Sequence, residues 1–338
     1  MALFKRKTGR GAPVAEPVQE VPASREALFE EIRRLAAQDP AARDLATERR
    51  LLRLRHAAGA RMLDEDRGAP TYPEPDPGAL PAGDGLPEFA PADLTPGLVR
   101  AAILRDGCVL VRGLVERGAA EWLADGIDRA FAERAGRRGT GHYEEFVPEE
   151  RFEVAAVRPW IEEGGGVLAA DSPPVAAAMF DMFEAAGLPR LVGGYLGEPP
   201  LISVHKTTLR KAEPTVGGAW HQDGAFMGDA RALNLWLSLS RCGDEAPGLD
   251  IVPRRLEQIV IGHDSMLDVE LTRRKAHDAA GDVPILRPIF EPGDALLFDE
   301  MFLHQTGSDP SMRKPRFAIE SWFFGASAFP PDYAPLAV

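Results

Sequence analysis

Hydrophobic and polar positions change their period near the middle of the chain. Up to Leu191, apolar residues mostly recur every three to four positions, as in "ERGAAEWLADGIDRAFAERAG", which is the spacing of an amphipathic helix. Beyond Leu191, short apolar or alternating runs bounded by Gly, Pro or Asp occur at 201–209, 217–223, 231–239, 248–252, 285–290, 295–299 and 316–324. Such runs are typical of the strands of a barrel or sandwich. The pattern therefore predicts a helical layer followed by a β-rich core.

The helical part contains several predicted elements. Ser24 is a suitable N-cap for a helix over "REALFEEIRRLAAQ", and Asp39-Pro40 should end that helix. Further helices are predicted over "AARDLATERRLLRLRHAAGARML", over "PGLVRAAILRDG" ending at Gly107, and over "PPVAAAMFDMFEAAG". "CVLVRGL" reads as a short buried strand, and the Gly-rich stretch at 137–172 as an irregular loop over a pocket.

Composition divides the chain into four parts. We expect a disordered tail at 1–22, a helical extension at 23–66, a Pro/Gly-rich linker at 67–94 and one large domain at 95–338. The expected fold class is α+β, with a β core flanked by helices and preceded by the helical extension.

Charge and cysteine content restrict the partners. The 338 residues carry 39 Lys and Arg against 52 Asp and Glu, a net charge of −13. This balance argues against nucleic acid or an anionic membrane as a partner. We find no apolar run of membrane-spanning length and no hydrophobic segment after the basic start, and Cys108 and Cys242 form no C-x-x-C pair. We therefore expect a cytoplasmic monomer or homodimer that acts on a small molecule.

The stretch "GGAWHQDGAF" carries candidate chemistry. His221 and Asp223 are two residues apart on a predicted strand, so both should point to one face. His304 follows the predicted strand "ALLFD", and a barrel can bring it to the same place. Two imidazoles and one carboxylate suit a divalent transition metal. The 2-His-1-carboxylate set leaves coordination positions open, as in non-haem Fe(II) oxygenases.

Arg316 adds a feature that the metal does not need. A turn at Gly307-Ser308-Asp309-Pro310 would reverse the chain and place the strand of Arg316 beside His304. A guanidinium inside a barrel has to be paired, and a metal-bound dicarboxylate would pair it through a bidentate contact. Arg313 is the alternative to Arg316 for this role, but its position in a loop makes it the weaker candidate for a side chain inside the barrel.

Together the segments "WHQDG", "GDALLFDEMFLHQTG" and "RKPRFAIESWFF" resemble the phytanoyl-CoA dioxygenase family of Fe(II)/2-oxoglutarate-dependent oxygenases, over roughly residues 95–325. The resemblance implies a double-stranded β-helix core of the jelly-roll, cupin-like kind. It implies that Fe(II) is bound by His221, Asp223 and His304. It also implies a site for 2-oxoglutarate, with Arg316 and Thr306 on the distal carboxylate and Trp236 lining the site.

The implied function is that of a dioxygenase. With Fe(II), 2-oxoglutarate and O₂, the protein would hydroxylate an unactivated C–H bond of a small molecule and convert 2-oxoglutarate to succinate. The intact Asp223 argues against halogenation. The stretch "GLDIVPRRLE" departs from the G-x-L-x-x-x-P-G-S-H pattern of many relatives. Its Arg254 and Arg255 either bind an anionic group of the substrate or lie in a solvent-exposed turn.

Two alternatives stay open. One is a catalytically silent binding or sensing protein on the same fold, and the other is a cupin-type metal isomerase or hydrolase, which would not need Arg316. Among the other polar residues, His205, Lys206 or Thr207 could face the pocket. His56 and the arginines at 49–55 are interpreted as the solvated face of a helix.

Overall fold

The structure is a computed structural model that describes residues 21–65, 68, 70–82, 86–136, 141–215, 217–228, 230–262 and 268–338. The tail expected at 1–22 lies outside these residues, apart from its last two positions. Within the described ranges, the helices are α1 (Arg25–Ala36), α2 (Leu45–Leu63), α3 (Pro96–Asp106), α4 (Arg117–Arg134), α5 (Arg158–Glu163), α6 (Pro173–Ala185), α7 (Leu188–Leu196), α8 (Gly224–Met227) and α9 (Val269–Ala280). The strands are β1 (Glu88–Phe89), β2 (Cys108–Val111), β3 (Gly166–Leu168), β4 (Pro200–Ala212), β5 (Ala232–Ser238), β6 (Gly248–Ile251), β7 (Ala295–Phe298), β8 (His304–Gly307), β9 (Arg316–Gly325) and β10 (Pro335–Ala337).

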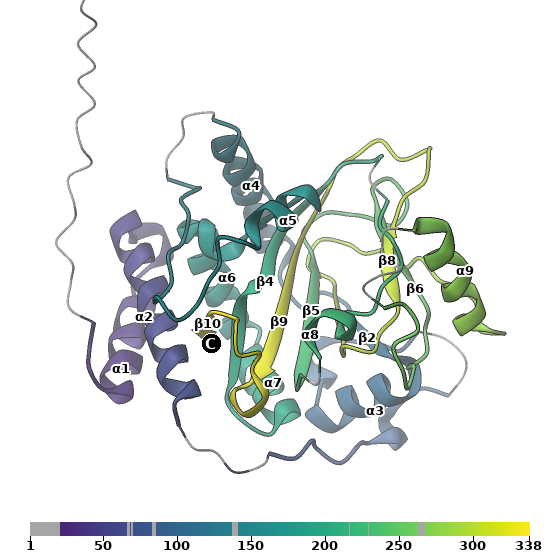
Figure 1. The fold of residues 1–338 in the computed structure, drawn as a ribbon, viewed down its shortest axis with the longest axis horizontal. Helices are drawn as coiled ribbons and strands as arrows, with labels where there is room; N and C mark the ends of the chain where they lie inside the picture. Colours follow the sequence, from purple (N-terminus) through teal and green to yellow (C-terminus); the bar gives the residue numbers. More distant parts are fainter. Residues whose placement is uncertain are drawn as a thin grey trace, which may run out of the picture.

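One large sheet forms the centre of the molecule (Figure 1). Among the described residues it has eight strands in the order β1-β2-β7-β5-β9-β4-β10, and β3 also pairs with β4. Every pair is antiparallel except β1 with β2. The register between β4 and β9 shifts between Ile202 and Thr207, which marks a β-bulge in β4. The strands predicted at 201–209, 231–239, 295–299 and 316–324 are thereby confirmed.

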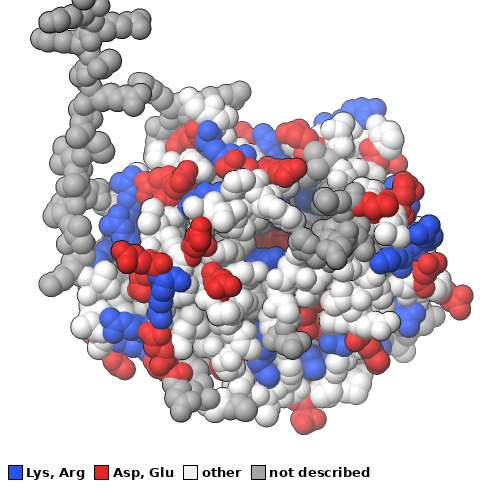
Figure 2. All heavy atoms as spheres, viewed as in Figure 1, with Lys and Arg blue, Asp and Glu red and all other residues white. Residues whose placement is uncertain are grey.

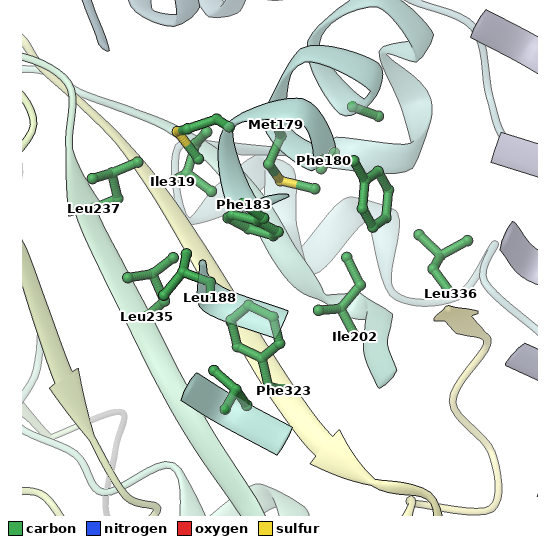
Figure 3. Packing of buried hydrophobic residues seen from close by; sticks show 14 of the residues in the cluster. Met179, Phe180, Phe183, Leu188, Ile202, Leu235, Leu237, Ile319, Phe323 and Leu336 are labelled. Carbon is green, nitrogen blue, oxygen red and sulfur yellow. The ribbon is translucent and has the colours of Figure 1, made fainter. Parts of the chain in front are cut away.

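The central strands of this sheet bury both faces, in two different cores. On β9, Ile319 and Phe323 belong to the core under the helices, whereas Ala318, Trp322 and Phe324 belong to a second core on the opposite face. Alternating side chains of a strand point to opposite faces, which explains this division. Figure 3 shows Phe323 directed toward α6, where its ring lies 5.3 Å from that of Phe183.

A smaller sheet closes the second core. Strands β6 and β8 pair antiparallel, and isolated bridges extend them at His221–His304 and Ile251–Leu286. Leu249 and Ile251 of β6 pack in one cluster with Trp236, Phe298 and Trp322 of the large sheet. The two sheets therefore face each other around a shared interior. The strand expected at 285–290 is wrong, because only the bridges at Leu286 and Phe290 form there and Pro288 between them has no N–H to donate.

Helices cover the outside of both sheets. The N-terminal pair α1 and α2 packs onto β10 and β4 through an apolar cluster that includes Leu28, Leu54, Met62, Leu201 and Ala337. On the opposite side of the molecule, α9 lies beside β6 and β8 (Figure 1). The pattern at 269–280 did not predict α9, because its buried stripe holds only Thr272, Ala276 and Ala280. The stretch 137–172 is also less irregular than expected, since it contains α5 and β3.

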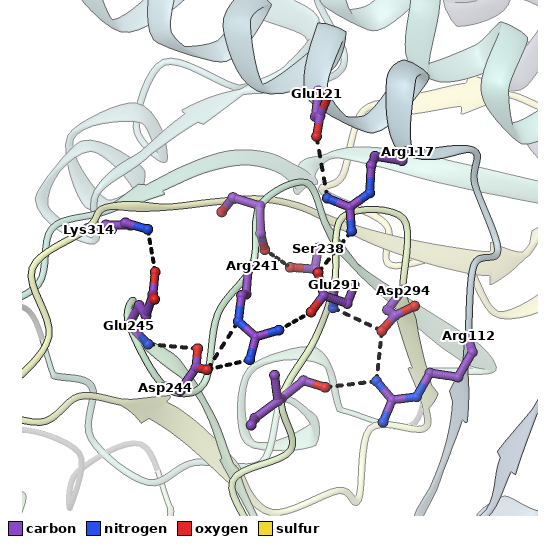
Figure 4. A network of polar contacts seen from close by, with 12 residues as sticks. Arg112, Arg117, Glu121, Ser238, Arg241, Asp244, Glu245, Glu291, Asp294 and Lys314 are labelled. Carbon is purple, nitrogen blue, oxygen red and sulfur yellow. Dashed lines mark hydrogen bonds and ion pairs between the residues drawn. The ribbon is translucent and has the colours of Figure 1, made fainter.

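A polar network fixes the turn before β7 (Figure 4). The buried Asp294 accepts hydrogen bonds from Gly113 N at 2.8 Å, Arg112 Nη1 at 2.7 Å and Glu291 N at 3.0 Å. Gly293 has φ +96°, and a Cβ there would lie 2.0 Å from Val115 O. The Gly293-Asp294 motif is therefore structural: it joins the end of β2 to the start of β7.

The surface carries charges of both signs. Figure 2 shows acidic and basic side chains interspersed over the viewed face, with a hollow near its centre. Among the described residues no helix combines the length and the apolarity needed to span a bilayer.

The interpretation of His56 as a solvated residue is wrong. Its side chain is 5% exposed, Nδ1 lies 2.8 Å from Pro335 O, and Nε2 accepts a hydrogen bond from Glu149 N at 3.0 Å. Since a carbonyl only accepts, Nδ1 carries the proton and the ring is neutral. Burial lowers the pKa of His56. Arg55 is likewise not solvated, because its guanidinium lies 3.9 Å from the centre of the Phe180 ring.

We expect Phe323→Ala to lower the free energy of unfolding by about 3–5 kcal/mol, because it removes a fully buried ring and leaves a cavity under α6. Trp122→Ala, at a position 55% exposed, should change it by no more than about 0.5 kcal/mol. Denaturant titration of both variants checks this. Equal destabilisation by the two would contradict the assigned core.

We expect His56 to make the protein less stable in mild acid. Below about pH 6.5 the imidazole of the unfolded chain takes up a proton that the buried ring resists, so the unfolded state binds more protons. The free energy of unfolding should therefore fall as the pH drops below about 6.5, and the slope should be shallower in His56→Gln. The exposed His277→Gln is the control and should keep the wild-type slope. An unchanged slope in His56→Gln would contradict the assignment.

Candidate metal centre and its cavity

His221 and His304 lie side by side because their backbones pair. His221 N donates to His304 O at 2.9 Å and His304 N donates to His221 O at 3.1 Å. The two imidazole centroids are 4.3 Å apart. Asp223 completes the group, since one ligand atom from each of the three residues lies within 4.8 Å of the others. Among the described residues this is the only group of three or more His, Cys, Asp or Glu that could hold a metal ion.

The predicted reason for the proximity of His221 and Asp223 is wrong. The stretch 217–223 is not a strand, because its backbone contacts with β8 amount to the bridge at His221 and one hydrogen bond from Gly218 N to Thr306 O. Asp223 has helical dihedrals (φ −64°, ψ −25°) and precedes the short helix α8. Gly224 permits this turn: its N donates to Glu300 O at 2.9 Å, and a Cβ would lie 3.1 Å from the same oxygen. The chain thus turns after His221, and the turn brings the carboxylate beside the two imidazoles.

Hydrogen bonds to backbone carbonyls orient both imidazoles. Nδ1 of His221 lies 2.9 Å from Ala219 O, and Nδ1 of His304 lies 3.1 Å from Phe302 O. Each Nδ1 must therefore carry the proton, which leaves the Nε2 lone pair for a metal. Burial and the neighbouring His221 lower the pKa of His304 to about 4, so this ring is neutral at pH 7.

The carboxylate of Asp223 is buried and incompletely paired. Its Oδ2 has no hydrogen-bond partner among the described residues and lies 3.8 Å from Nε2 of the neutral His304. A buried anionic oxygen without a partner is unfavourable by several kcal/mol. A divalent cation held by this oxygen and two imidazole nitrogens would remove that penalty, so the residues present fit a metal of this kind.

Gln222 is a positioning residue that the sequence did not indicate. Its side chain is fully buried, and Nε2 donates to Gln258 O at 3.1 Å and Met301 O at 2.9 Å. Its Oε1 accepts from Val260 N at 2.8 Å. The amide thus uses both of its N–H donors and one of the two lone pairs of its oxygen. The residue between the two candidate ligands thus ties their loop to two neighbouring loops.

Arg316 lies in the interior but not where the sequence placed it. The expected hairpin does not form, because β8 belongs to the small sheet and β9 to the large one. Arg316 therefore faces the interior from the opposite sheet. It is 4% exposed, donates to Gly248 O at 3.1 Å, and has a buried Nε without a hydrogen-bond partner. No carboxylate of the described residues pairs with it, and burial lowers the pKa of its guanidinium.

The other two predicted cosubstrate residues also face the interior. Trp236 is buried on the interior face of β5, with its ring centroid 5.4 Å from Cζ of Arg316. Thr306 is opposite Leu249 in the small sheet and two residues beyond His304, so both point to the interior. The rival Arg313 uses its Nη1 on the carbonyls of its own loop and does not enter the interior.

A cavity of about 210 Å³ opens beside the candidate metal centre. We call His221, Asp223 and His304 the triad. The cavity lining combines aromatic, charged and hydroxyl side chains with two members of the triad: Trp160, Ile161, Gly164, His205, Lys206, Thr208, Arg210, His221, Asp223, Phe226 and Glu320. Trp160 and Ile161 belong to α5, so the segment expected to cover a pocket does border one. A mixed apolar and charged lining of this kind is typical of a small-molecule site.

Several of the less specific candidates are now placed. His205 and Lys206 line the cavity, whereas Thr207 points to the helical side and contacts Ser321 Oγ at 3.2 Å. Arg255 pairs with the buried Asp299 at 2.8 Å, outside the cavity lining, which accounts for one of the two arginines in the unusual loop.

The fold and this site define a β-core protein of the 2-His-1-carboxylate class. The phytanoyl-CoA dioxygenase (PhyH) family matches residues 103–318, more than half of the chain, so the protein belongs to that family. This confirms the resemblance on which the sequence interpretation rested. No protein of curated function matches the chain in sequence.

Three of the similar solved structures have 18–21% sequence identity to this chain. EctD from S. alaskensis with 2-oxoglutarate and 5-hydroxyectoine has a TM-score of 0.50 at 18% identity, over 78% of this chain and 86% of its own. The epimerase SnoN in complex with Fe3+, alpha ketoglutarate and nogalamycin RO has a TM-score of 0.47 at 21% identity, over 67% and 82%. AviO1 from Streptomyces viridochromogenes Tue57 has a TM-score of 0.47 at 18% identity, over 69% and 96%. The similarity to EctD supports the fold.

We expect Gln222→Leu to weaken Co(II) binding by about 10–100-fold, the loss typical when the residues that orient metal ligands are removed. Leucine fills most of the space but makes none of the three hydrogen bonds. Isothermal titration of the metal-free protein measures the affinity. Gln258→Leu is the matched control, because only the backbone carbonyl of this exposed residue is used. Equal affinities in the two variants would exclude the positioning role.

Proposed function

We propose that this protein is a non-haem Fe(II)- and 2-oxoglutarate-dependent oxygenase that hydroxylates a C–H bond of a small molecule. One observation carries the proposal: within the described ranges, the two facing sheets enclose an Asp223 oxygen without a hydrogen-bond partner beside two imidazoles, and a buried guanidinium at Arg316 without a carboxylate partner. A metal ion would pair with the Asp223 oxygen, and an anion would pair with the Arg316 guanidinium. A dicarboxylate bound to the metal would provide both partners at once.

The triad would hold the metal. His221, Asp223 and His304 would bind Fe(II) and leave the remaining coordination positions to the keto-acid group of 2-oxoglutarate and to O₂. When bound, Fe(II) supplies the oxidation of the substrate C–H bond, coupled to the conversion of 2-oxoglutarate to succinate. The protein fixes the two imidazole donor atoms through the backbone pairing of the histidines and the carbonyl contacts of their Nδ1 atoms.

The residues at the far end of the interior would hold the cosubstrate. Arg316 would donate to the distal carboxylate of 2-oxoglutarate, with Thr306 as a second donor and Trp236 as an apolar wall. The spacing supports this arrangement, because Thr306 lies about 7 Å along the strand from His304. The facing pair of sheets is interpreted as a double-stranded β-helix, and the N-terminal helices as an extension that packs against it.

The walls of the cavity would exclude water from the reacting centre. His304 and Asp223 are 4% and 6% exposed, so a substrate that fills the adjoining cavity covers the remaining open side. Membership of the PhyH family and the intact Arg316 favour this function over a silent binding protein or a cupin-type isomerase or hydrolase. An isomerase or hydrolase has no use for a buried guanidinium that no carboxylate of the described residues pairs with.

We expect Arg316→Ala to weaken 2-oxoglutarate binding by at least about 10-fold while Co(II) binding stays unchanged, because charge-assisted hydrogen bonds contribute about 1.5–3 kcal/mol. Succinate formation should fall with it. Anaerobic titration of the Fe(II)-loaded protein, followed by the absorption of the Fe(II)–2-oxoglutarate complex, measures the affinity. Arg313→Ala is the control, since this residue lies outside the interior.

The same titration tests the triad and the alternatives. Asp223→Ala should abolish Fe(II) binding by removing one of three ligands. Unchanged 2-oxoglutarate affinity in Arg316→Ala would exclude the cosubstrate role. Metal-dependent turnover without 2-oxoglutarate would favour the isomerase or hydrolase instead.

A further inference from the structure

The cavity wall beyond the triad carries one more positive than negative charge. Apart from the triad, its fully charged residues are Lys206, Arg210 and Glu320. Arg210 pairs with Glu320 through Nη2 at 3.0 Å and Nε at 3.2 Å. Burial opposes ionisation of this carboxyl, but Arg210, His304 and Lys206 together outweigh burial and lower the pKa of Glu320 to about 2. The charges of Arg210 and Glu320 cancel, so Lys206 leaves this wall with one net positive charge.

Lys206 has no polar partner within the described part of the chain. Its ammonium makes neither a hydrogen bond nor a salt bridge there, and lies 5.2 Å from the centre of the Phe226 ring. A cation–π contact at a partly exposed site contributes only about 0.5–1 kcal/mol. By contrast, Lys211 on the same strand is paired with Asp128 at 2.7 Å outside the cavity. The cationic head of Lys206 is thus available to a ligand.

Two aromatic rings border the cavity next to this lysine. Phe226 follows Asp223 on α8, and Trp160 comes from α5, with ring centroids 6.4 Å apart. Trp160 is 60% exposed although it borders a cavity. The helix that carries it is anchored, because Arg158 makes a bidentate contact with the buried Asp171 at 2.8 and 2.9 Å. An exposed aromatic held at a cavity by a fixed helix is typical of a ligand-binding surface.

The loaded metal centre would not change this balance. In the proposed function, the charges of Fe(II), Asp223, Arg316 and 2-oxoglutarate cancel, so the cavity keeps the single positive charge of Lys206. The cavity therefore attracts an anionic ligand and repels a cationic one.

We infer that the substrate is a small organic acid with an aromatic or aliphatic body, whose anionic group pairs with Lys206 while the body lies against Phe226 and Trp160. This inference rests on the proposed function and specifies the substrate class of the same site. The anionic group would be held on β4, and the C–H bond to be oxidised would lie on the part of the body nearest to Asp223 and His221.

Matched acids and amides test the inference without turnover. The full-length protein, loaded anaerobically with Fe(II) and 2-oxoglutarate, is titrated with phenylacetate, 3-phenylpropionate, 4-phenylbutyrate and 2-naphthylacetate, and with the primary amide of each. Tryptophan fluorescence and calorimetry give the dissociation constants. The wild type should bind at least one acid about 10-fold more tightly than its amide, the difference expected for one charge-assisted contact.

The variants then locate the preference. Lys206→Met should reduce the acid preference to within about 2-fold and leave the affinity for the amide unchanged. Lys206→Glu should reverse the preference toward 4-phenylbutylamine. Lys211→Met is the control on the same strand and should behave as the wild type.

Other outcomes overturn the inference. It is wrong if the wild type prefers no acid of the panel, or if Lys206→Met keeps the preference. It is also wrong if Lys206→Met weakens 2-oxoglutarate binding, which would assign the lysine to the cosubstrate. These failures leave the proposed function intact as long as the Fe(II)–2-oxoglutarate absorption forms. Absence of that absorption in the wild type would refute the proposed function itself.

Discussion

Two backbone hydrogen bonds between His221 and His304 are the constraint on which the site depends. They join residues far apart in the chain across the small sheet and place two imidazoles 4.3 Å apart. Neither ring can turn freely, because each Nδ1 is bonded to a carbonyl two residues before it in the chain. The free energy of folding thus sets the direction of the lone pairs, and a metal would not have to order them.

Burial has opposite effects on the neutral and the charged groups of the interior. It keeps His304 neutral, which suits a metal ligand, because it lowers the pKa of this ring to about 4. It penalises the guanidinium of Arg316 and the unpaired oxygen of Asp223, since both are charged groups with incomplete partners. A fold tolerates such groups only when the rest of the structure holds them in place, and they are retained where a ligand supplies the missing partner.

Much of the fold was predictable, because its signals are local. The Ser24 cap accepts a hydrogen bond from Ala27 N as expected, and Gly107 ends α3 with φ +79°. The residue types of the proposed metal site stood out in the sequence, because only a few kinds of side chain commonly bind transition metals. The mode of approach was not predictable: Asp223 starts a helix rather than continuing a strand, and β9 joins the other sheet. These features, like the burial of His56, depend on contacts between segments far apart in sequence.

The bulge in β4 decides which side chains reach the cavity. In a regular strand His205 and Lys206 would point to opposite faces, yet both line the cavity. The register shift between Ile202 and Thr207 explains this, because a bulge re-aims side chains at its own position. Beyond it, Thr208 and Arg210 face the interior in regular alternation, while Thr207 faces the helical layer. A short irregularity that leaves no mark in the hydrophobic pattern therefore places both His205 and Lys206 on the cavity wall.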